Sequence, residues 1–415
     1  MGMSSKKHQI PAIRFKGFTD AWEQRKLKEV ANHRGGTAIE KYFSKNGKYK
    51  VISIGSYGIN SKYIDQGIRA VSNDITDVRV VRKGELTMVL NDKTSNGTII
   101  GRSLLIDTDN EYVINQRTEI LSPKENFDSS FAYITLNGPF REKVRKIVQG
   151  GTQIYVNYPV VENLKLELPD LEEQKKIGTF FKYLDDTIDL HQRQMDNCKE
   201  LKKTSMQKIF NQELRFKDKN GNDYPVWQKK KLKDLGKFYS GTGFNDKYQG
   251  YLDLSIPFFK VSDMNIASNS KYMVESNNTV DDDICREMKI NKITGPAILF
   301  AKVGAAIYME RKRIVHNDFL MDNNMMALRI NDSVDIEFTY YLCQSLSFSK
   351  YAQVGALPSY NASDIGRLHC KLPVISEQKK IAIFLSILDQ KVNEAAQKVE
   401  LFKELKEGLM QQMFF

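Results

Sequence analysis

The sequence predicts an α/β (α+β) fold with two domains in tandem, each followed by a long α-helix. We expect the two helices to pair as an antiparallel coiled coil with pseudo-twofold symmetry. Three observations lead to this prediction: an internal repeat at about half the chain length, apolar residues at heptad spacing near the end of each copy, and short strand-like runs between them.

The repeat is clearest at the end of each half. Residues 168–210 align without a gap onto residues 372–414, with 17 identities in 43 positions, including the EQKKI block that begins at Glu173 and Glu377. The openings also match, because Trp22 and Trp227, the two tryptophans of the chain, stand in similar sequences. The predicted boundaries are therefore 1–167 and 215–371 for the domains, and 168–214 and 372–415 for the helices.

Each helical segment carries an apolar strip. In the second copy the strip runs through Ile381, Leu385, Leu388 and Val392 in alternating steps of four and three, while His191 and Lys202 interrupt the strip of the first copy. Helices of about 60 Å need to bury such a strip, and each is the natural partner of the other. Antiparallel pairing would place the two domains at opposite ends of a rod.

The domains themselves read as mixed α/β. Runs rich in β-branched and aromatic residues alternate with Gly, Asn and Asp turns. The strand candidates are 49–54, 86–90, 99–106, 298–301 and 319–330.

Composition and motifs argue against catalysis by this chain. The formal net charge is +11, which suits a nucleic-acid partner but also an ordinary basic protein. No Pro-Pro-aromatic motif of an amine methyltransferase and no GK[ST] motif of an ATPase is found, and the four Cys and five His have no metal-ligand spacing. Gly241 and Gly243 imitate an S-adenosylmethionine turn, and Asp170 with Lys175 a nuclease set, but a plain turn and a helix cap explain them better. With no apolar run of ~18 residues, we expect a cytoplasmic protein that contacts no membrane.

These features together resemble the specificity subunits of type I restriction–modification enzymes. The resemblance covers nearly the whole chain. It is carried by RFKGFTDAWEQRKL at the start, by KGELTMVL and GPAILFAKVG inside the domains, and by ELPDLEEQKKIGTFFKYLDDTI and KLPVISEQKKIAIFLSILDQKV at the ends of the halves.

The resemblance implies a non-catalytic subunit that binds double-stranded DNA and reads a bipartite, asymmetric target. The domains would be target-recognition domains and the helices spacers. Each half would engage one of two methyltransferase subunits, and restriction subunits would join the complex. It also implies that this chain binds no cofactor, with S-adenosylmethionine held by the methyltransferase subunits and ATP and Mg by the restriction subunits. The alternative is a coiled-coil protein that spaces two protein-binding domains.

Candidate DNA-binding residues are those where loops combine glycine with hydrogen-bond donors, although for any single residue a solvated turn is the favoured interpretation. In the first domain they are Lys93, Thr94, Ser95, Asn96, Thr152, Gln153, Tyr155 and Asn157. In the second they are Lys302, Arg311, Lys312, Arg313, Ser359, Tyr360 and Asn361.

Candidate partner-binding residues are the two EQKK blocks, for which a solvated first helical turn is the alternative. They are Glu173, Gln174, Lys175, Lys176, Glu377, Gln378, Lys379 and Lys380. For the two tryptophans we favour a structural anchor between domain and helix over base stacking.

Overall fold

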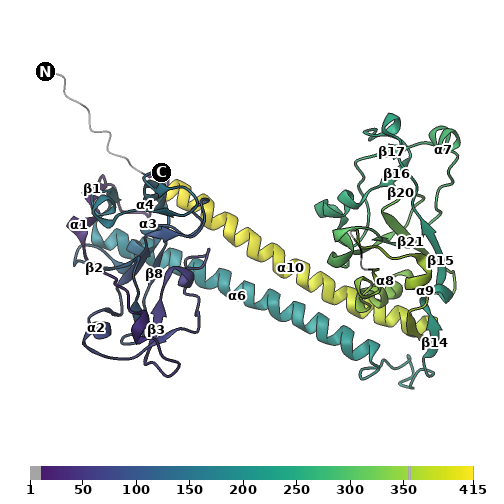
Figure 1. The fold of residues 1–415 in the computed structure, drawn as a ribbon, viewed down its shortest axis with the longest axis horizontal. Coiled ribbons are helices and arrows are strands. Elements are labelled where there is room, and N and C mark those ends of the chain that lie inside the picture. Colours follow the sequence, from purple (N-terminus) through teal and green to yellow (C-terminus); the bar gives the residue numbers. More distant parts are fainter. Residues whose placement is uncertain (1–10, 354, 356, 415) are drawn as a thin grey trace. The chain divides into compact units, whose positions relative to one another are not determined.

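The computed structural model describes residues 11–353, 355 and 357–414 (Figure 1). The chain forms two units. The first contains the described residues up to Gln192 and from Gln397 onward, and the second runs from Arg193 to Ala396. Each unit therefore combines one α/β domain with the first half of its own long helix and the second half of the other.

Each domain has a four-stranded antiparallel sheet at its centre, and equivalent strands follow the same order in the two sheets. In the first domain the order is β2 (Ala31–Gly35), β10 (Thr118–Pro123), β6 (Leu86–Val89) and β8 (Ser103–Leu105). In the second it is β15 (Gly236–Ser240), β21 (Met325–Ile330), β18 (Ala297–Ala301) and β19 (Lys312–Val315).

A second sheet in each domain is built around one parallel strand pair. In the first domain the order is β4 (Arg69–Ala70), β3 (Tyr49–Ile52), β9 (Tyr112–Ile114) and β5 (Val80–Val81), with β3 and β9 parallel. In the second it is β17 (Thr279–Val280), β16 (Ile256–Phe259) and β20 (Leu320–Met321), with β16 and β20 parallel.

The beginning and end of each domain are joined by a two-stranded antiparallel sheet. Strand β1 (Glu23–Lys26) pairs with β13 (Lys165–Leu168), and β14 (Gln228–Lys231) pairs with β22 (His369–Leu372). The chain thus enters and leaves each domain at neighbouring strands. A further small sheet, found in the first domain, has the order β11 (Gln149–Gly150), β12 (Ile154–Tyr155) and β7 (Asn91–Asp92).

Short helices cover these sheets. Asp128 accepts a 2.9 Å hydrogen bond from the Phe131 amide and caps α3, and Asp335 caps α8 in the same way through Phe338 at 2.8 Å. The short helices of the first domain are α1 (Leu27–Val30), α2 (Asp74–Asp77), α3 (Ser129–Asn137), α4 (Pro139–Arg145) and α5 (Tyr158–Val161). Those of the second are α7 (Asp282–Met288), α8 (Ile336–Ser345) and α9 (Ala362–Gly366).

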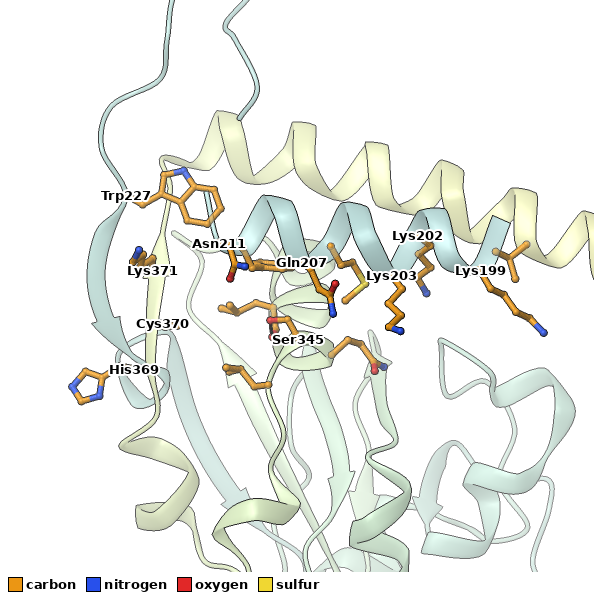
Figure 2. Close-up of a pocket in the computed structure, with 16 residues that line it drawn as sticks. Lys199, Lys202, Lys203, Gln207, Asn211, Trp227, Ser345, His369, Cys370 and Lys371 are labelled. Atoms are coloured by element: carbon orange, nitrogen blue, oxygen red, sulfur yellow. Dashed lines mark hydrogen bonds between the residues drawn. The ribbon is translucent and has the colours of Figure 1, made fainter. Parts of the chain in front are cut away.

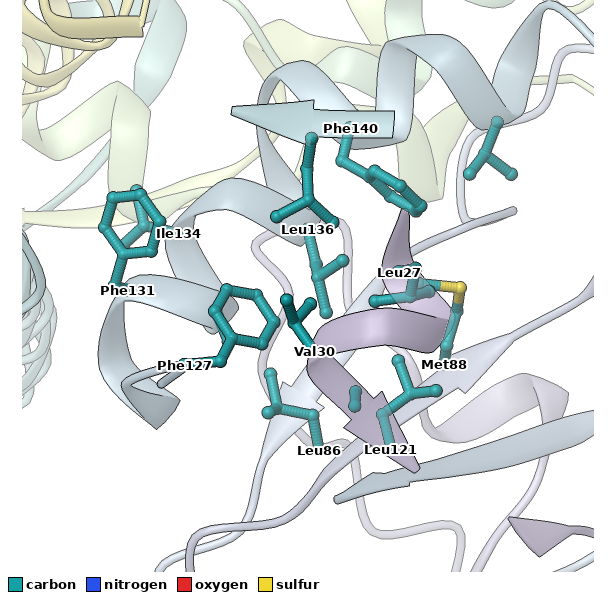
Figure 3. Packing of buried hydrophobic residues seen from close by; sticks show 14 of the residues in the cluster. Leu27, Val30, Leu86, Met88, Leu121, Phe127, Phe131, Ile134, Leu136 and Phe140 are labelled. Carbon is teal, nitrogen blue, oxygen red and sulfur yellow. The ribbon is translucent and has the colours of Figure 1, made fainter. Parts of the chain in front are cut away.

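The core of the first unit joins sheet and helices (Figure 3). Leu86, Met88 and Leu121 from the central sheet meet Phe127, Phe131 and Phe140 from the segment around α3 and α4. Phe181 and Phe414, from the two long helices, pack on the same cluster, so the helices belong to the core of the domain.

The long helices α6 (Leu171–Phe210) and α10 (Ile375–Phe414) lie side by side and antiparallel. In the first unit Lys406 Nζ lies 2.5 Å from Asp185 Oδ1, and in the second Lys202 pairs with Asp389. The repeat alignment matches Asp185 with Asp389 and Lys202 with Lys406, so the two ion pairs are repeat-related. The predicted fold class, including antiparallel pairing, is confirmed.

The strands agree with prediction except where a turn divides a run. The 99–106 segment is extended only at β8, since Gly97 and Gly101 have φ angles of 66° and 72° and form a turn. The 319–330 segment is two strands separated by a turn at Asp322. No helix among the described residues is both long enough and apolar enough to cross a bilayer.

Candidate nucleic-acid interface

In the first domain the structure brings the two predicted DNA-binding loops together. The turn that contains residues 93–96 follows β7, and the 151–153 turn links β11 to β12, which pairs with β7. Asp92 orders the first turn by accepting hydrogen bonds from the Thr94 amide and hydroxyl and the Ile99 amide, at 2.8–2.9 Å. The side chains of Lys93, Thr94, Ser95, Asn96, Thr152, Gln153, Tyr155 and Asn157 are exposed.

One arginine outside the predicted set supports this surface. Arg141, from α4, is buried and donates to the carbonyl oxygens of Gly97, Thr98 and Ile100 at 2.8–3.0 Å. Burial, together with the nearby charges of Arg102 and Arg145, lowers the pKa of Arg141 to about 10. The basic run from Arg141 to Lys146 was the available signal, but its contact with a loop some forty residues earlier depends on tertiary structure.

The second domain repeats this arrangement with other residues. Ser359 forms bridges with Val303 and Gln353, and the Tyr360 amide donates to the Lys302 carbonyl oxygen at 3.2 Å. In the first domain the Val156 amide donates to the Leu90 carbonyl at 2.9 Å in the same way. Lys302 and the 359–361 segment are therefore neighbours, as the 93–96 and 151–155 segments are.

Within the 359–361 segment two side chains have structural partners. Tyr360 is buried and donates a 2.5 Å hydrogen bond to the Ala301 carbonyl oxygen. Asn361 caps α9 by accepting from the amides of Ser363 and Asp364. Ser359 is half-buried and Asn361 is exposed, so a ligand can still reach Asn361.

The basic triplet at 311–313 divides into one buried and two half-buried side chains. Lys312 is 1% exposed, pairs with Glu310 and donates to the Leu346 carbonyl oxygen at 3.0 Å. Arg311 donates to the Met264 carbonyl oxygen and the Asn265 side chain, and Arg313 to the Asn269 carbonyl oxygen. Lys312 thus has an internal role, which the charge pattern alone could not distinguish from a surface role.

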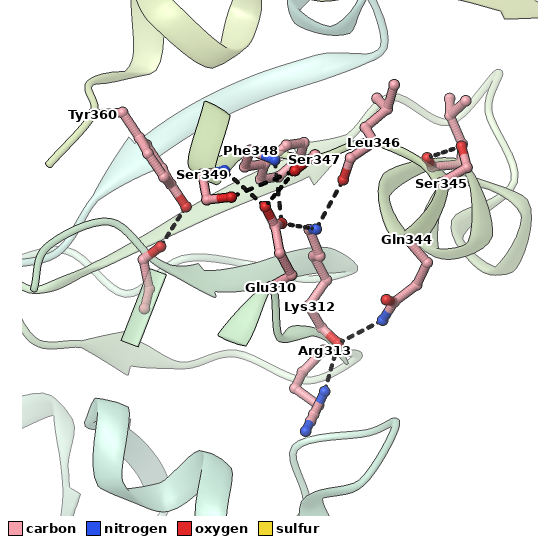
Figure 4. A network of polar contacts seen from close by, with 12 residues as sticks. Glu310, Lys312, Arg313, Gln344, Ser345, Leu346, Ser347, Phe348, Ser349 and Tyr360 are labelled. Carbon is pink, nitrogen blue, oxygen red and sulfur yellow. Dashed lines mark hydrogen bonds and ion pairs between the residues drawn. The ribbon is translucent and has the colours of Figure 1, made fainter. Parts of the chain in front are cut away.

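Glu310 is the centre of this network. It accepts hydrogen bonds from the amides of Phe348 and Ser349 and from the Ser347 hydroxyl, at 2.7–3.1 Å (Figure 4). Burial opposes ionisation of Glu310, but the hydrogen bonds from Lys312 and Ser349 outweigh it and lower its pKa to about 2. The network fixes the loop that follows α8.

In each EQKK block the glutamate and the glutamine are buried, and the two lysines are more accessible. Glu173 is fully buried and receives two hydrogen bonds from Arg14, at 2.6 and 2.9 Å, and Glu377 receives the equivalent pair from Arg215. Gln174 and Gln378 are also buried, and they accept from the amides of Asp128 and Asp335, the N-caps of α3 and α8. The side chains left for a partner are those of the lysines. Lys175, Lys176 and Lys379 are exposed, and Lys380 is half-buried.

Both tryptophans are buried, in agreement with the structural interpretation. Trp22 packs edge-on against Phe131 and Phe414, and Trp227 against Phe338 and Phe210. The Trp227 indole also donates a 3.0 Å hydrogen bond to Glu377. Trp227 therefore anchors its domain to both long helices, and Trp22 anchors its domain to α10.

No group of three or more His, Cys, Asp or Glu side chains within the described ranges is placed to hold a metal ion. The exposed donors instead gather on loops at one strand edge of each domain. The two domains thus form a tandem pair built on one scaffold, each with exposed polar loops.

The family is shown by a match to the model of the type I restriction modification DNA specificity domain. The model matches the chain twice, at residues 19–200 and 206–401. This chain belongs to that family and carries two tandem copies of the domain.

Curated relatives and solved structures agree. The chain is 22% identical to the type I restriction enzyme MjaIX specificity subunit of Methanocaldococcus jannaschii, over 95% of this chain and 93% of the relative. It is 29% identical to the MjaVIII specificity subunit of the same organism, over 52% and 51%. A crystal structure of the S subunit of a type I system from M. genitalium has the same fold, with a TM-score of 0.60, 14% identity and coverage of 98% and 99%. A structure described for complex assembly and conformational transition of the type I system matches with a TM-score of 0.56, 14% identity and coverage of 95% and 97%.

Proposed function

We propose that this chain is the non-catalytic specificity subunit of a type I restriction–modification complex and acts on DNA in the cytoplasm. In this role it reads a bipartite, asymmetric DNA target and directs two methyltransferase subunits and the restriction subunits to it. S-adenosylmethionine would be bound by the methyltransferase subunits, and ATP and Mg by the restriction subunits.

The observation that carries the proposal is the pair of equivalent loop surfaces with different residues. Exposed Lys93, Ser95 and Asn96 with Gln153 form one surface, and Lys302 with Asn361 the other. Lysines neutralise phosphates without reading sequence, whereas amide and hydroxyl side chains read base edges. Two surfaces of different composition on one scaffold are suited to two different half-sites.

The direct test is to co-express the chain with the methyltransferase subunit encoded beside it and to map methylated bases across the host genome. The expected result is one split motif with unlike halves and a fixed gap. An assembled, active complex that methylates a single undivided site, or no site, would contradict the proposal and favour a protein that merely spaces partners.

Independent reading by the two domains is tested by exchange. Replacing residues 15–167 with the corresponding domain of a relative should change one half of the methylated motif and leave the other half and the gap unchanged. A change in both halves would show that the domains do not read separately.

The role of the helices is tested by insertion. Adding seven residues in register to both α6 and α10, at repeat-equivalent positions, preserves the heptad seam and lengthens each helix by about 10 Å. The gap between half-sites should widen by roughly three base pairs, at 3.4 Å each along a strand. An unchanged gap would argue that the helices do not set it.

A further inference from the structure

An open groove lies in the second unit beside the C-terminal half of α6 (Figure 2). It has a volume of about 870 Å³. Its apolar wall comes from α6, from the end of α8 and the residue that follows it, from the residue before β14, and from α10. The apolar lining residues are Met206, Phe210, Trp227, Leu342, Leu346 and Val392.

Among the described residues of the first unit, the opening at the repeat-equivalent place is much smaller. Residues Phe414, Leu166 and Glu167 there match Phe210, Cys370 and Lys371 of the groove, yet the space they line is about 10 Å³. It is filled by α4, whose Pro139, Phe140 and Lys143 complete the lining. After α8 the second domain has a loop and the short 3-10 turn Ser349–Tyr351 instead of a second helix.

The charge of the site also changes between the two units. In the first unit Lys143 of α4 reaches toward Glu167, with Nζ 3.8 Å from Oε1. The equivalent residue in the second unit is Lys371, which is exposed. A segment in the position of α4 would therefore need an acidic residue where α4 has a lysine.

Other lysines strengthen this requirement. Lys199, Lys202 and Lys203 project from one side of α6 along the groove (Figure 2). Lys202 is paired with Asp389. Lys199 and Lys203 are exposed, and Lys203 lies 3.7 Å from Glu200 in an exposed ion pair on the same helix. The groove has an apolar wall and a cationic rim, and the lining includes no Asp or Glu.

The lining distinguishes a protein partner from DNA. A phosphate backbone would satisfy the lysines but has no apolar side chains to cover Met206, Phe210 and Leu346. An amphipathic helix satisfies both, and in the first unit a helix of this chain already fills the corresponding position. Helix-in-groove docking of this kind is a common mode of protein recognition.

We propose that this groove is the docking site for an acidic amphipathic helix of a partner protein, which takes the place in the second unit that α4 takes in the first. The inference rests on the proposed function, because the experiment that tests it uses the methyltransferase subunit as the binding partner. The two units therefore offer this subunit unequal sites, and the site on the second unit includes the groove.

The test is titration of the full chain with the purified methyltransferase subunit, with both binding steps resolved by calorimetry and native mass spectrometry. Reversing the exposed charges in Lys199→Glu, Lys203→Glu and Lys371→Glu together should weaken one of the two steps by about tenfold or more and leave the other unchanged. Gln207→Trp, which narrows the groove without changing charge, should weaken the same step. Lys208→Glu, on the same helix outside the groove lining, is the matched control and should change neither.

Circular dichroism melting of each variant confirms that it is folded. If both steps keep their affinity in the folded groove variants, the groove is not a docking site and the inference is overturned, while the proposed function stands. If the variants weaken duplex DNA binding and leave both steps intact, the groove belongs to the DNA surface and the inference is again overturned. If the unaltered chain binds no methyltransferase subunit, the proposed function itself fails.

Discussion

Arg14 and Arg215 each hold a fully buried glutamate in the first turn of a long helix. The carboxylates of Glu173 and Glu377 are 0% exposed, and a buried charge is tolerated only when its partners satisfy it. Burial of these residues explains why the Arg-Phe-Lys opening and the EQKK block occur together in each half. The two motifs form one contact.

Arg14→Ala should therefore destabilise the first unit by about 3–5 kcal/mol, because it leaves Glu173 buried without its cation. Urea unfolding followed by tryptophan fluorescence measures the loss. Arg25→Ala is the control, since the exposed pair of Arg25 with Glu23 should contribute about 1 kcal/mol or less. Equal effects from the two substitutions would contradict the assigned role of Arg14.

Glu119 gives the first domain a pH-dependent stability. Burial raises the pKa of this carboxyl from its ordinary value of 4.5 to about 7, and His33, whose pKa burial lowers, lies 3.6 Å away. The folded state binds the Glu119 proton more tightly than the unfolded state does. Its contribution is therefore fully present below pH 4.5 and is lost as the pH rises through 7.

Glu119→Gln should remove this dependence. Measured by urea unfolding, the stability of the variant relative to the parent chain should increase from pH 6 to pH 8. The same substitution at Glu125, which is exposed, serves as the control and should show no such trend. A difference between variant and parent that stays constant with pH would show that Glu119 does not titrate in this range.

At the scale of the elements, burial varies along the long helices. Ile381 and Leu385 are fully buried near the start of α10, as are Met413 and Phe414 at its end, whereas Val392 in the middle is half-buried. In the predicted seam His191 stacks on Phe402 with ring centroids 5.1 Å apart. The interruptions of the apolar strip are thus accommodated by specific contacts between the helices.

Leu385→Ala should cost about 2–5 kcal/mol, because it opens a cavity in the core of the second unit. Ile383, two residues earlier, is 60% exposed, and its replacement by alanine should change stability by about 0.5 kcal/mol or less. Thermal unfolding of the two variants measures the difference. Similar melting temperatures would mean that this part of α10 does not pack on the domain.

Some features of these elements can be predicted from the sequence, and others cannot. Heptad spacing and the repeat predict α6 and α10 to within a few residues, because periodicity is a local property. The β1–β13 pairing, the contact of Arg141 with the 97–100 loop and the burial of Lys312 depend on residues far apart in sequence. No local pattern distinguishes a buried lysine such as Lys312 from exposed Lys93.

At the scale of the whole molecule, the two units share their long helices. Phe402, Leu409, Met410, Met413 and Phe414 of α10 pack in the core of the first unit, and Ile209 and Phe210 of α6 in that of the second. The first unit is therefore built from two separate stretches of chain, whereas the second is one continuous stretch.

Removal of residues 397–415 should consequently damage the first unit, to which these residues belong, and spare the second. Limited proteolysis read by mass spectrometry should show rapid cleavage within residues 11–192, while residues 193–396 stay protected. Phe414→Ala, which removes one side chain that packs against both Trp22 and Phe131, should have a weaker effect in the same direction. Uniform protection of the first unit after truncation would contradict this account.

The position of Phe414 in the core that contains Trp22 also has a consequence for biosynthesis. A ribosome makes Phe414 long after Trp22, so the first domain emerges long before the side chains that close it. The second domain meets α6 as soon as it is made. The domain that is translated first must therefore be the last to become complete, and until then its exposed aromatic cluster is a natural substrate for chaperones.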